Sequence, residues 1–103
     1  MNKLVLMGVV LVTLMLSFPA LAESEAEQTA KNLCAGCHGP NGISTNPLWP
    51  NLAGQKDQYA AKQLRAYRDG SRVDPNMNGI SQTLTDAQID ALAAYYAKQP
   101  GGG

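Results

Sequence analysis

An all-α fold is predicted by the pattern of apolar residues along the 103-residue chain. No segment alternates apolar and polar residues as a half-buried β-strand does, and no internal repeat is visible. Separate segments instead carry apolar residues at intervals of three and four, which is the spacing of one helix face. The chain is long enough for one domain and too short for two.

The first expected element is a secretory signal peptide over residues 1–22. Lys3 precedes an apolar run from 4 to 18, and the Ala-Leu-Ala sequence ending at Ala22 fits the pattern of signal peptidase sites. Cleavage after Ala22 is expected, and export then makes the periplasm the predicted compartment. An uncleaved membrane anchor is the alternative, because the run approaches the roughly 17–25 residues that span a bilayer.

The remaining chain is divided into a domain at 23–100 and a flexible, glycine-only tail at 101–103. After Lys3 is removed, seven Lys and Arg face eight Asp and Glu, so the net charge is close to zero. No basic stripe is present, and nucleic acid is therefore not an expected partner. The core of such a small domain buries little surface, so a covalent cross-link or a bound metal is expected to add to its stability.

A helix is expected over 23–33, because acidic residues occupy its first turn and apolar residues follow at spacings of three and four. It leads into CAGCHGPNG at 34–42, whose Gly and Pro end regular structure. The stretch 43–54 is predicted to be a loop, and a loop this long is often functional.

Two further helices are predicted in the second half of the chain. One covers 56–69 and ends at Gly70, and the other covers 86–98, where Thr85 and Gln88 form a capping box. The intervening stretch 71–84 is predicted to be irregular.

The only two cysteines and the only histidine, Cys34, Cys37 and His38, form a Cys-x-x-Cys-His motif. A redox dithiol is one interpretation, but that chemistry normally lies at a strand-to-helix junction. Structural zinc is another, but the three residues leave a fourth ligand missing. Covalent attachment of one haem c uses all three, with two thioethers and an imidazole ligand to iron, and is the favoured interpretation.

A haem iron held by one His has a sixth coordination position, for which Met77 is the only methionine outside the expected leader. It lies in a polar stretch with Pro75 and Gly79, which favours ligation over core filling. Asn76 and Asn78 flank it and are candidates for hydrogen bonding to its sulfur.

The chain resembles the small bacterial monohaem class I cytochromes c, and also one half of their dihaem relatives. CAGCHGPNG, LWPNLAGQ at 48–55, QLRAYRDGSR at 63–72, DPNM at 74–77 and LTDAQIDALAAYYA at 84–97 occur in the order typical of that family. The resemblance implies a compact class I cytochrome c fold, with about three main helices and loops wrapped around the haem.

The resemblance also implies roles for individual residues. Pro50 lies where the family has a proline whose carbonyl accepts the His38 Nδ1–H, which orients a ligand ring. Arg72 is the candidate partner of a haem propionate, and Arg65 and Arg68 are expected to be solvated. The residues expected to pack in the haem pocket are Trp49, Leu52, Leu64, Tyr67 and Leu92.

The predicted function is periplasmic electron transfer by a monomeric protein that is not an enzyme. Two protein ligands leave no easy coordination site for a substrate. Expected partners are redox proteins, one donor and one acceptor, that dock transiently through a small patch. The alternatives are a haem enzyme or gas sensor with a labile sixth ligand, and a cytochrome subunit of a larger oxidoreductase complex.

Overall fold

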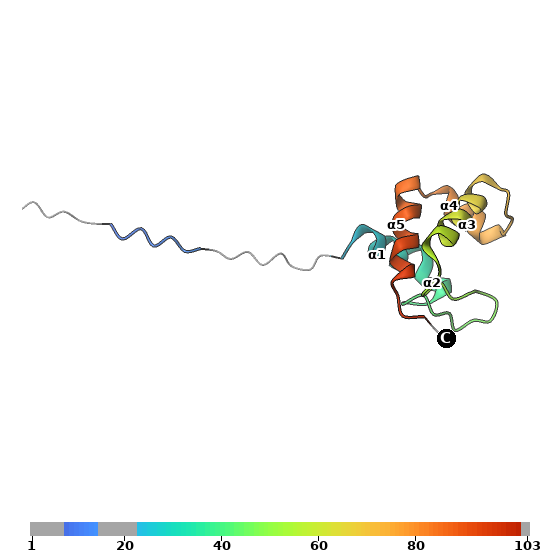
Figure 1. The fold of residues 1–103 in the computed structure, drawn as a ribbon, viewed down its shortest axis with the longest axis horizontal. Coiled ribbons are helices and arrows are strands. Elements are labelled where there is room, and N and C mark those ends of the chain that lie inside the picture. Colours follow the sequence, from blue (N-terminus) through green and yellow to red (C-terminus); the bar gives the residue numbers. More distant parts are fainter. Residues whose placement is uncertain (1–7, 15–22, 102–103) are drawn as a thin grey trace, which may run out of the picture.

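The computed structural model describes residues 8–14 and 23–101 (Figure 1). Within these ranges the chain contains helices, turns and loops but no strand, which confirms the all-α prediction. Most of the expected leader at 1–22 lies outside the described residues, as do residues 102–103 of the expected tail, and residues 8–14 form no helix. In the described part, no helix is both long and apolar enough to cross a bilayer.

The N-terminal helix is longer than predicted and changes its pitch. It begins as α1 (Glu25–Thr29), widens into the π-helical η1 (Ala30–Cys34) and ends as α2 (Ala35–His38). Ser24 caps it by accepting a hydrogen bond from the Glu27 backbone N–H at 3.1 Å. The Cys-x-x-Cys-His motif therefore lies inside the helix and not after it. A π-helical turn is a rare feature that occurs mostly at functional sites.

Helix α3 (Asp57–Asp69) agrees closely with the predicted helix at 56–69. Gly70 ends it in the left-handed conformation, with φ of 86°, as expected for a glycine in that place. α3 packs against both α4 and α5 (Figure 1).

The prediction that 71–84 is irregular is wrong, because α4 (Pro75–Gln82) occupies most of it. The Asp74 side chain caps this helix by accepting hydrogen bonds from the backbone N–H groups of Asn76 and Met77, both at 2.9 Å. Pro75 at the first helical position needs no N–H partner and has a suitable φ. Gly79 is accommodated inside the helix, where it was expected to favour a loop.

Helix α5 (Asp86–Ala97) supplies most of the core. The predicted capping box is confirmed, since Thr85 and Gln88 exchange hydrogen bonds between side chain and backbone at 2.9 and 3.1 Å. Ile89 and Leu92 are fully buried on its inner face. The other buried apolar residues of the core are Ala30, Ala61, Leu84, Ala93 and Tyr96. The core thus joins η1, α3 and α5.

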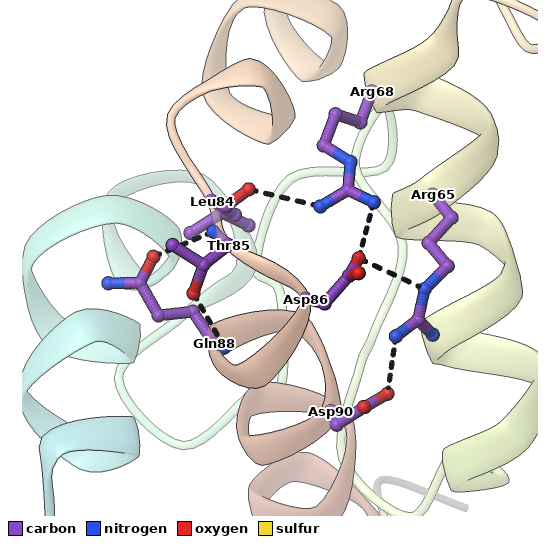
Figure 2. A network of polar contacts seen from close by, with 7 residues as sticks. All are labelled: Arg65, Arg68, Leu84, Thr85, Asp86, Gln88 and Asp90. Atoms are coloured by element: carbon purple, nitrogen blue, oxygen red, sulfur yellow. Dashed lines mark hydrogen bonds and ion pairs between the residues drawn. The ribbon is translucent and has the colours of Figure 1, made fainter.

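Arginines of α3 bind acidic residues of α5 (Figure 2). Arg65 Nη2 lies 2.9 Å from Asp90 Oδ1, and Arg68 donates to Asp86 Oδ1 and to the Leu84 carbonyl oxygen. The hydrogen bond from Arg68 lowers the pKa of the Asp86 carboxyl from its usual value. The expectation that Arg65 and Arg68 are simply solvated is therefore corrected: they tie α3 to α5, although solvent exposure keeps each pair weak.

Candidate functional site

A cavity of about 430 Å³ lies among η1, α2, the loop 43–54, α3, α4 and α5. Its volume falls within the roughly 300–1,000 Å³ typical of small-molecule and cofactor sites. The structure places every residue predicted to attach, ligate or contact the haem on the wall of this one cavity: Cys34, Cys37, His38, Trp49, Pro50, Leu52, Leu64, Tyr67, Arg72, Met77 and Leu92. Segments distant in sequence therefore bring two thiols, an imidazole and a thioether around one space.

His38 is the last residue of α2 and is only 7% exposed. Its Nδ1 lies 2.8 Å from the carbonyl oxygen of Pro50, which confirms the contact implied by the family resemblance. A carbonyl oxygen can only accept, so this contact requires Nδ1 to carry the proton. The lone pair of Nε2 is then available to a metal, and the ring orientation is fixed by the backbone of the loop.

Cys34 and Cys37 are both free, half-buried thiols. Cys34 ends the π-helical η1 and packs against the core, whereas Cys37 lies on α2 directly before His38. Burial raises the pKa of the Cys34 thiol from its usual value.

The loop 43–54 is closed at its base by backbone hydrogen bonds. The Gly42 carbonyl oxygen accepts from Leu52 N at 2.7 Å and from Ala53 N at 3.0 Å, and Gly54 N donates to the Tyr96 carbonyl oxygen of α5 at 2.9 Å. Gly42 has φ of 78°, and a Cβ added there would lie 2.8 Å from the Tyr96 ring. Only glycine fits this approach, and the closed loop then presents Pro50 to the His38 ring.

Met77 reaches the cavity from the first turn of α4, so a helix and not an irregular loop presents it. Its side chain is half-buried, as are those of Leu64 and Tyr67, which come from α3. The wall near Met77 is therefore built where α3 and α4 pack together. In the described residues neither Asn76 nor Asn78 donates a side-chain hydrogen bond to the Met77 sulfur, because the Asn78 amide binds backbone oxygens instead.

Arg72 lies after the end of α3 and is exposed. Its Nη1 donates to Gln63 Oε1 at 2.7 Å, and the guanidinium carbon lies 4.6 Å from the centroid of the Tyr67 ring. These contacts hold a positive charge at the rim of the cavity. The guanidinium has further N–H donors, so it remains able to bind an anionic group there.

The sequence reasoning missed several residues of the cavity wall. Tyr59 and Gln63 lie on the same face of α3 as the predicted Leu64 and Tyr67, so the helical spacing could have found them. Leu48 belongs to the quoted LWPNLAGQ stretch and is 82% exposed at the rim. Gln55 and Asp74 also line the cavity and belong to the quoted LWPNLAGQ and DPNM stretches, whereas no sequence signal identified Ile80.

The donor set and the cavity fit an iron porphyrin. Two thiols and one imidazole lie within five consecutive positions, a thioether lies on the same wall, and the lining is mainly apolar, with one basic side chain, Arg72, at the rim. Among residues 8–14 and 23–101, no cluster of three or more His, Cys, Asp or Glu side chains is arranged to hold a metal ion by itself. The zinc interpretation therefore gains no support from the geometry.

Comparison with known proteins gives the same picture. Residues 24–99 match the family model described as cytochrome c. The chain is 42% identical over 83 residues to cytochrome c4 of Thiocapsa roseopersicina, covering 80% of this chain and 43% of that protein. It is 42% identical over 69 residues to cytochrome c-554(548) of Halomonas halodenitrificans, covering 64% of this chain and 83% of that protein.

A solved structure of reduced cytochrome c4 from Pseudomonas stutzeri superimposes with a TM-score of 0.64 at 35% identity, over 73% of this chain and 48% of that one. The chain thus spans about half the length of the cytochromes c4 that it matches. The agreement confirms the class I cytochrome c fold and the resemblance to one half of a longer relative. The family match over the whole helical domain, together with a Cys-x-x-Cys-His motif on the wall of a cofactor-sized cavity, shows that this chain belongs to the cytochrome c family.

Proposed function

We propose that this protein is a one-electron carrier with a single covalently bound haem c. Membership of the cytochrome c family implies the covalent haem and its iron. When bound, this group supplies a reversible change between ferric and ferrous iron. The observation that carries the proposal is the His38 ring, fixed by Pro50 with Nε2 free, beside two thiols and a thioether in one cavity.

Each candidate residue has a distinct role in this proposal. Cys34 and Cys37 would hold the haem through two thioethers, and His38 Nε2 and Met77 Sδ would bind its iron. Pro50 holds the proton on Nδ1 and thereby fixes the tautomer of the His38 ring. Met ligation raises the reduction potential and occupies the position that a substrate or gas would need.

The remaining wall residues control water and charge around the site. The half-buried Leu52 and Leu64 exclude water, and an apolar shell favours the less charged ferrous state. Trp49 lines the same cavity from the loop 43–54, with 37% of its surface exposed. Arg72 is proposed to bind a propionate at the rim, where Gln63 and Tyr67 already orient its guanidinium.

The proposed context is the periplasm, reached through a signal peptide at 1–22, with 23–100 as the working domain of a monomer. Partners are a donor and an acceptor among redox proteins, bound transiently. Two relatives of this chain, one from Thiomonas intermedia and one from Stutzerimonas stutzeri, are each named thiosulfate dehydrogenase electron acceptor. Their names support an oxidoreductase as the class of the donor. The exposed Leu48, at the rim of the cavity, supports docking through a small apolar patch there.

Absorption spectroscopy of protein expressed with a haem-attachment system tests the proposal. We expect a haem that survives denaturation, a weak red band from sulfur bound to ferric iron, and no binding of carbon monoxide by the reduced protein. Met77→Leu should abolish the sulfur band and admit carbon monoxide, whereas Ile80→Leu, also on the α4 wall, should keep both properties of the unmodified protein.

Mass spectrometry tests the covalent attachment of haem to the cysteines separately from the binding of iron by His38 and Met77. Cys34→Ala and Cys37→Ala should each lose one thioether, and the double variant should lose covalent haem altogether. Covalent haem without the sulfur band, but with prompt carbon monoxide binding, would contradict the electron-carrier proposal and favour an enzyme or sensor. Protein without covalent haem would contradict the proposal at its first step.

A further inference from the structure

Asn78, directly after Met77 on α4, joins three backbone segments of the cavity wall. Its Oδ1 accepts a hydrogen bond from Asp74 N at 2.8 Å. Its Nδ2 donates to the carbonyl oxygens of Tyr67 at 2.7 Å and Arg72 at 2.8 Å. One amide therefore links the last turn of α3, the connection that follows it and the N-cap of α4.

These contacts hold the Met77 backbone between Asp74, which precedes it, and Asn78, which follows it. Asp74 Oδ1 accepts from Met77 N at 2.9 Å, and Asn78 Oδ1 in turn accepts from Asp74 N. The pair forms a reciprocal cap around the first turn of α4, in the manner of a capping box with its partner one residue later. The Met77 backbone cannot move away from α3 unless the Asn78 contacts to Tyr67 and Arg72 break.

The Asn78 side chain spends most of its hydrogen-bonding capacity on these backbone contacts. Both N–H donors and one acceptor position are engaged with backbone groups, and the residue is half-buried. Tyr67, Arg72, Asp74 and Met77 all line the cavity. Asn78 thus fixes the position of a wall that it does not itself line.

We propose that Asn78 is a positioning residue that keeps the Met77 thioether on the cavity wall and slows its departure from iron. The inference rests on the proposed role of Met77 as an axial ligand. Loss of the two donated hydrogen bonds lets the first turn of α4 separate from α3 more often. Each separation frees the coordination position for an external ligand without unfolding the core.

The test is the rate at which excess imidazole replaces sulfur in the ferric protein, followed by loss of the red band in stopped flow. Asn78→Asp keeps the size and the acceptor but removes both donors. Gln82→Glu makes the same amide-to-carboxylate change at the exposed last residue of α4, and within the described residues the Gln82 side chain makes no hydrogen bond and does not line the cavity. Loss of two hydrogen bonds predicts replacement about tenfold faster in Asn78→Asp. The control should stay within about twofold of the unmodified protein.

Equal replacement rates in Asn78→Asp and the unmodified protein would overturn the inference. So would a lower denaturant midpoint with an unchanged replacement rate, because that result marks a residue of general structural importance only. Absence of the sulfur band from the unmodified protein would overturn the role of Met77, and with it both proposals. If the sulfur band is present and its rate of loss is unchanged in Asn78→Asp, only the inference about Asn78 is overturned.

A measurement on the unmodified, reduced protein is independent of variant folding. Both side-chain N–H protons of Asn78 are donated to backbone carbonyls, whereas Asn76 is exposed and, within the described residues, its side chain makes no hydrogen bond. Proton exchange with water, measured by NMR, is expected to be at least about tenfold slower for the Asn78 amide. Equal exchange of the two amides would contradict the described contacts and the inference.

Discussion

Gly42→Ala should destabilise the protein far more than Gly70→Ala, although both glycines have a positive φ. The angles are 78° at Gly42 and 86° at Gly70, so each replacement pays about 1–2 kcal/mol for a left-handed alanine. Around Gly70 an added Cβ meets nothing within 4 Å. Around Gly42 it would lie 2.8 Å from the Tyr96 ring and 2.9 Å from Ala53 N.

The close approach of the added Cβ to Tyr96 and Ala53 accounts for the difference in stability expected between the two variants. Overpacking of a core typically costs about 1–3 kcal/mol, so Gly42→Ala is expected to lose about 2–5 kcal/mol in total. Gly70→Ala is expected to lose only the first part, about 1–2 kcal/mol. Since small domains have about 5–15 kcal/mol of stability, Gly42→Ala approaches the limit for folding.

Denaturant unfolding of the haem-loaded proteins, followed by far-ultraviolet circular dichroism, measures both losses. Equal losses in the two variants would refute the reasoning, because they would show that the approach to Tyr96 is relieved without cost. Displacement of the loop 43–54 in Gly42→Ala should also disturb the Pro50 contact to His38, and the visible spectrum would report that change.

Three further predictions concern the helical domain. Ile89→Ala removes a side chain with 0% exposure, so a loss of about 2–5 kcal/mol in the free energy of unfolding is expected, and a smaller loss would indicate that the core collapses around the cavity. Thr85→Ala breaks the capping box of α5 and should cost about 1 kcal/mol in the same assay, an effect that Gln88→Ala should share in part. Asp86 has a lowered pKa, so its contribution is present above the unfolded-state pKa of about 4 and is lost as the pH falls through the lower folded-state pKa. Asp86→Asn should therefore flatten the dependence of stability on pH below about pH 4, and an unchanged acid transition would contradict this role.

The helices with local signals were predictable from sequence. α5 carries its own start signal in Thr85 and Gln88, and α3 carries its own stop in Gly70, so neither needs tertiary information. α4 was mistaken for an irregular stretch because Pro75 and Gly79 were interpreted as breakers. Asp74 followed by Pro75 is in fact a strong helix start, since Asp caps the first turn and Pro suits its first position.

Other features depend on the folded arrangement and could not be predicted locally. The π-helical turn before Cys34 has no recognised sequence signal, and it carries the predicted first helix onward to His38. The pairing of Arg65 and Arg68 with acids of α5 depends on which helices become neighbours. The cysteines and His38 were identifiable because they are adjacent in sequence, whereas Asn78 acts through backbone groups that only the fold brings near it.

The hydrogen bond between His38 Nδ1 and Pro50 has a consequence for how such a protein diverges. The acceptor is a main-chain oxygen, which every amino acid possesses, so no replacement of the Pro50 side chain deletes it. The imidazole can be retuned only by reshaping the loop, through positions such as Gly42 and Asn51 that hold its backbone. Substitutions in the loop can therefore change the strength of this hydrogen bond, and with it the basicity of the His38 ring, in small steps. No single replacement at position 50 removes the hydrogen-bond acceptor.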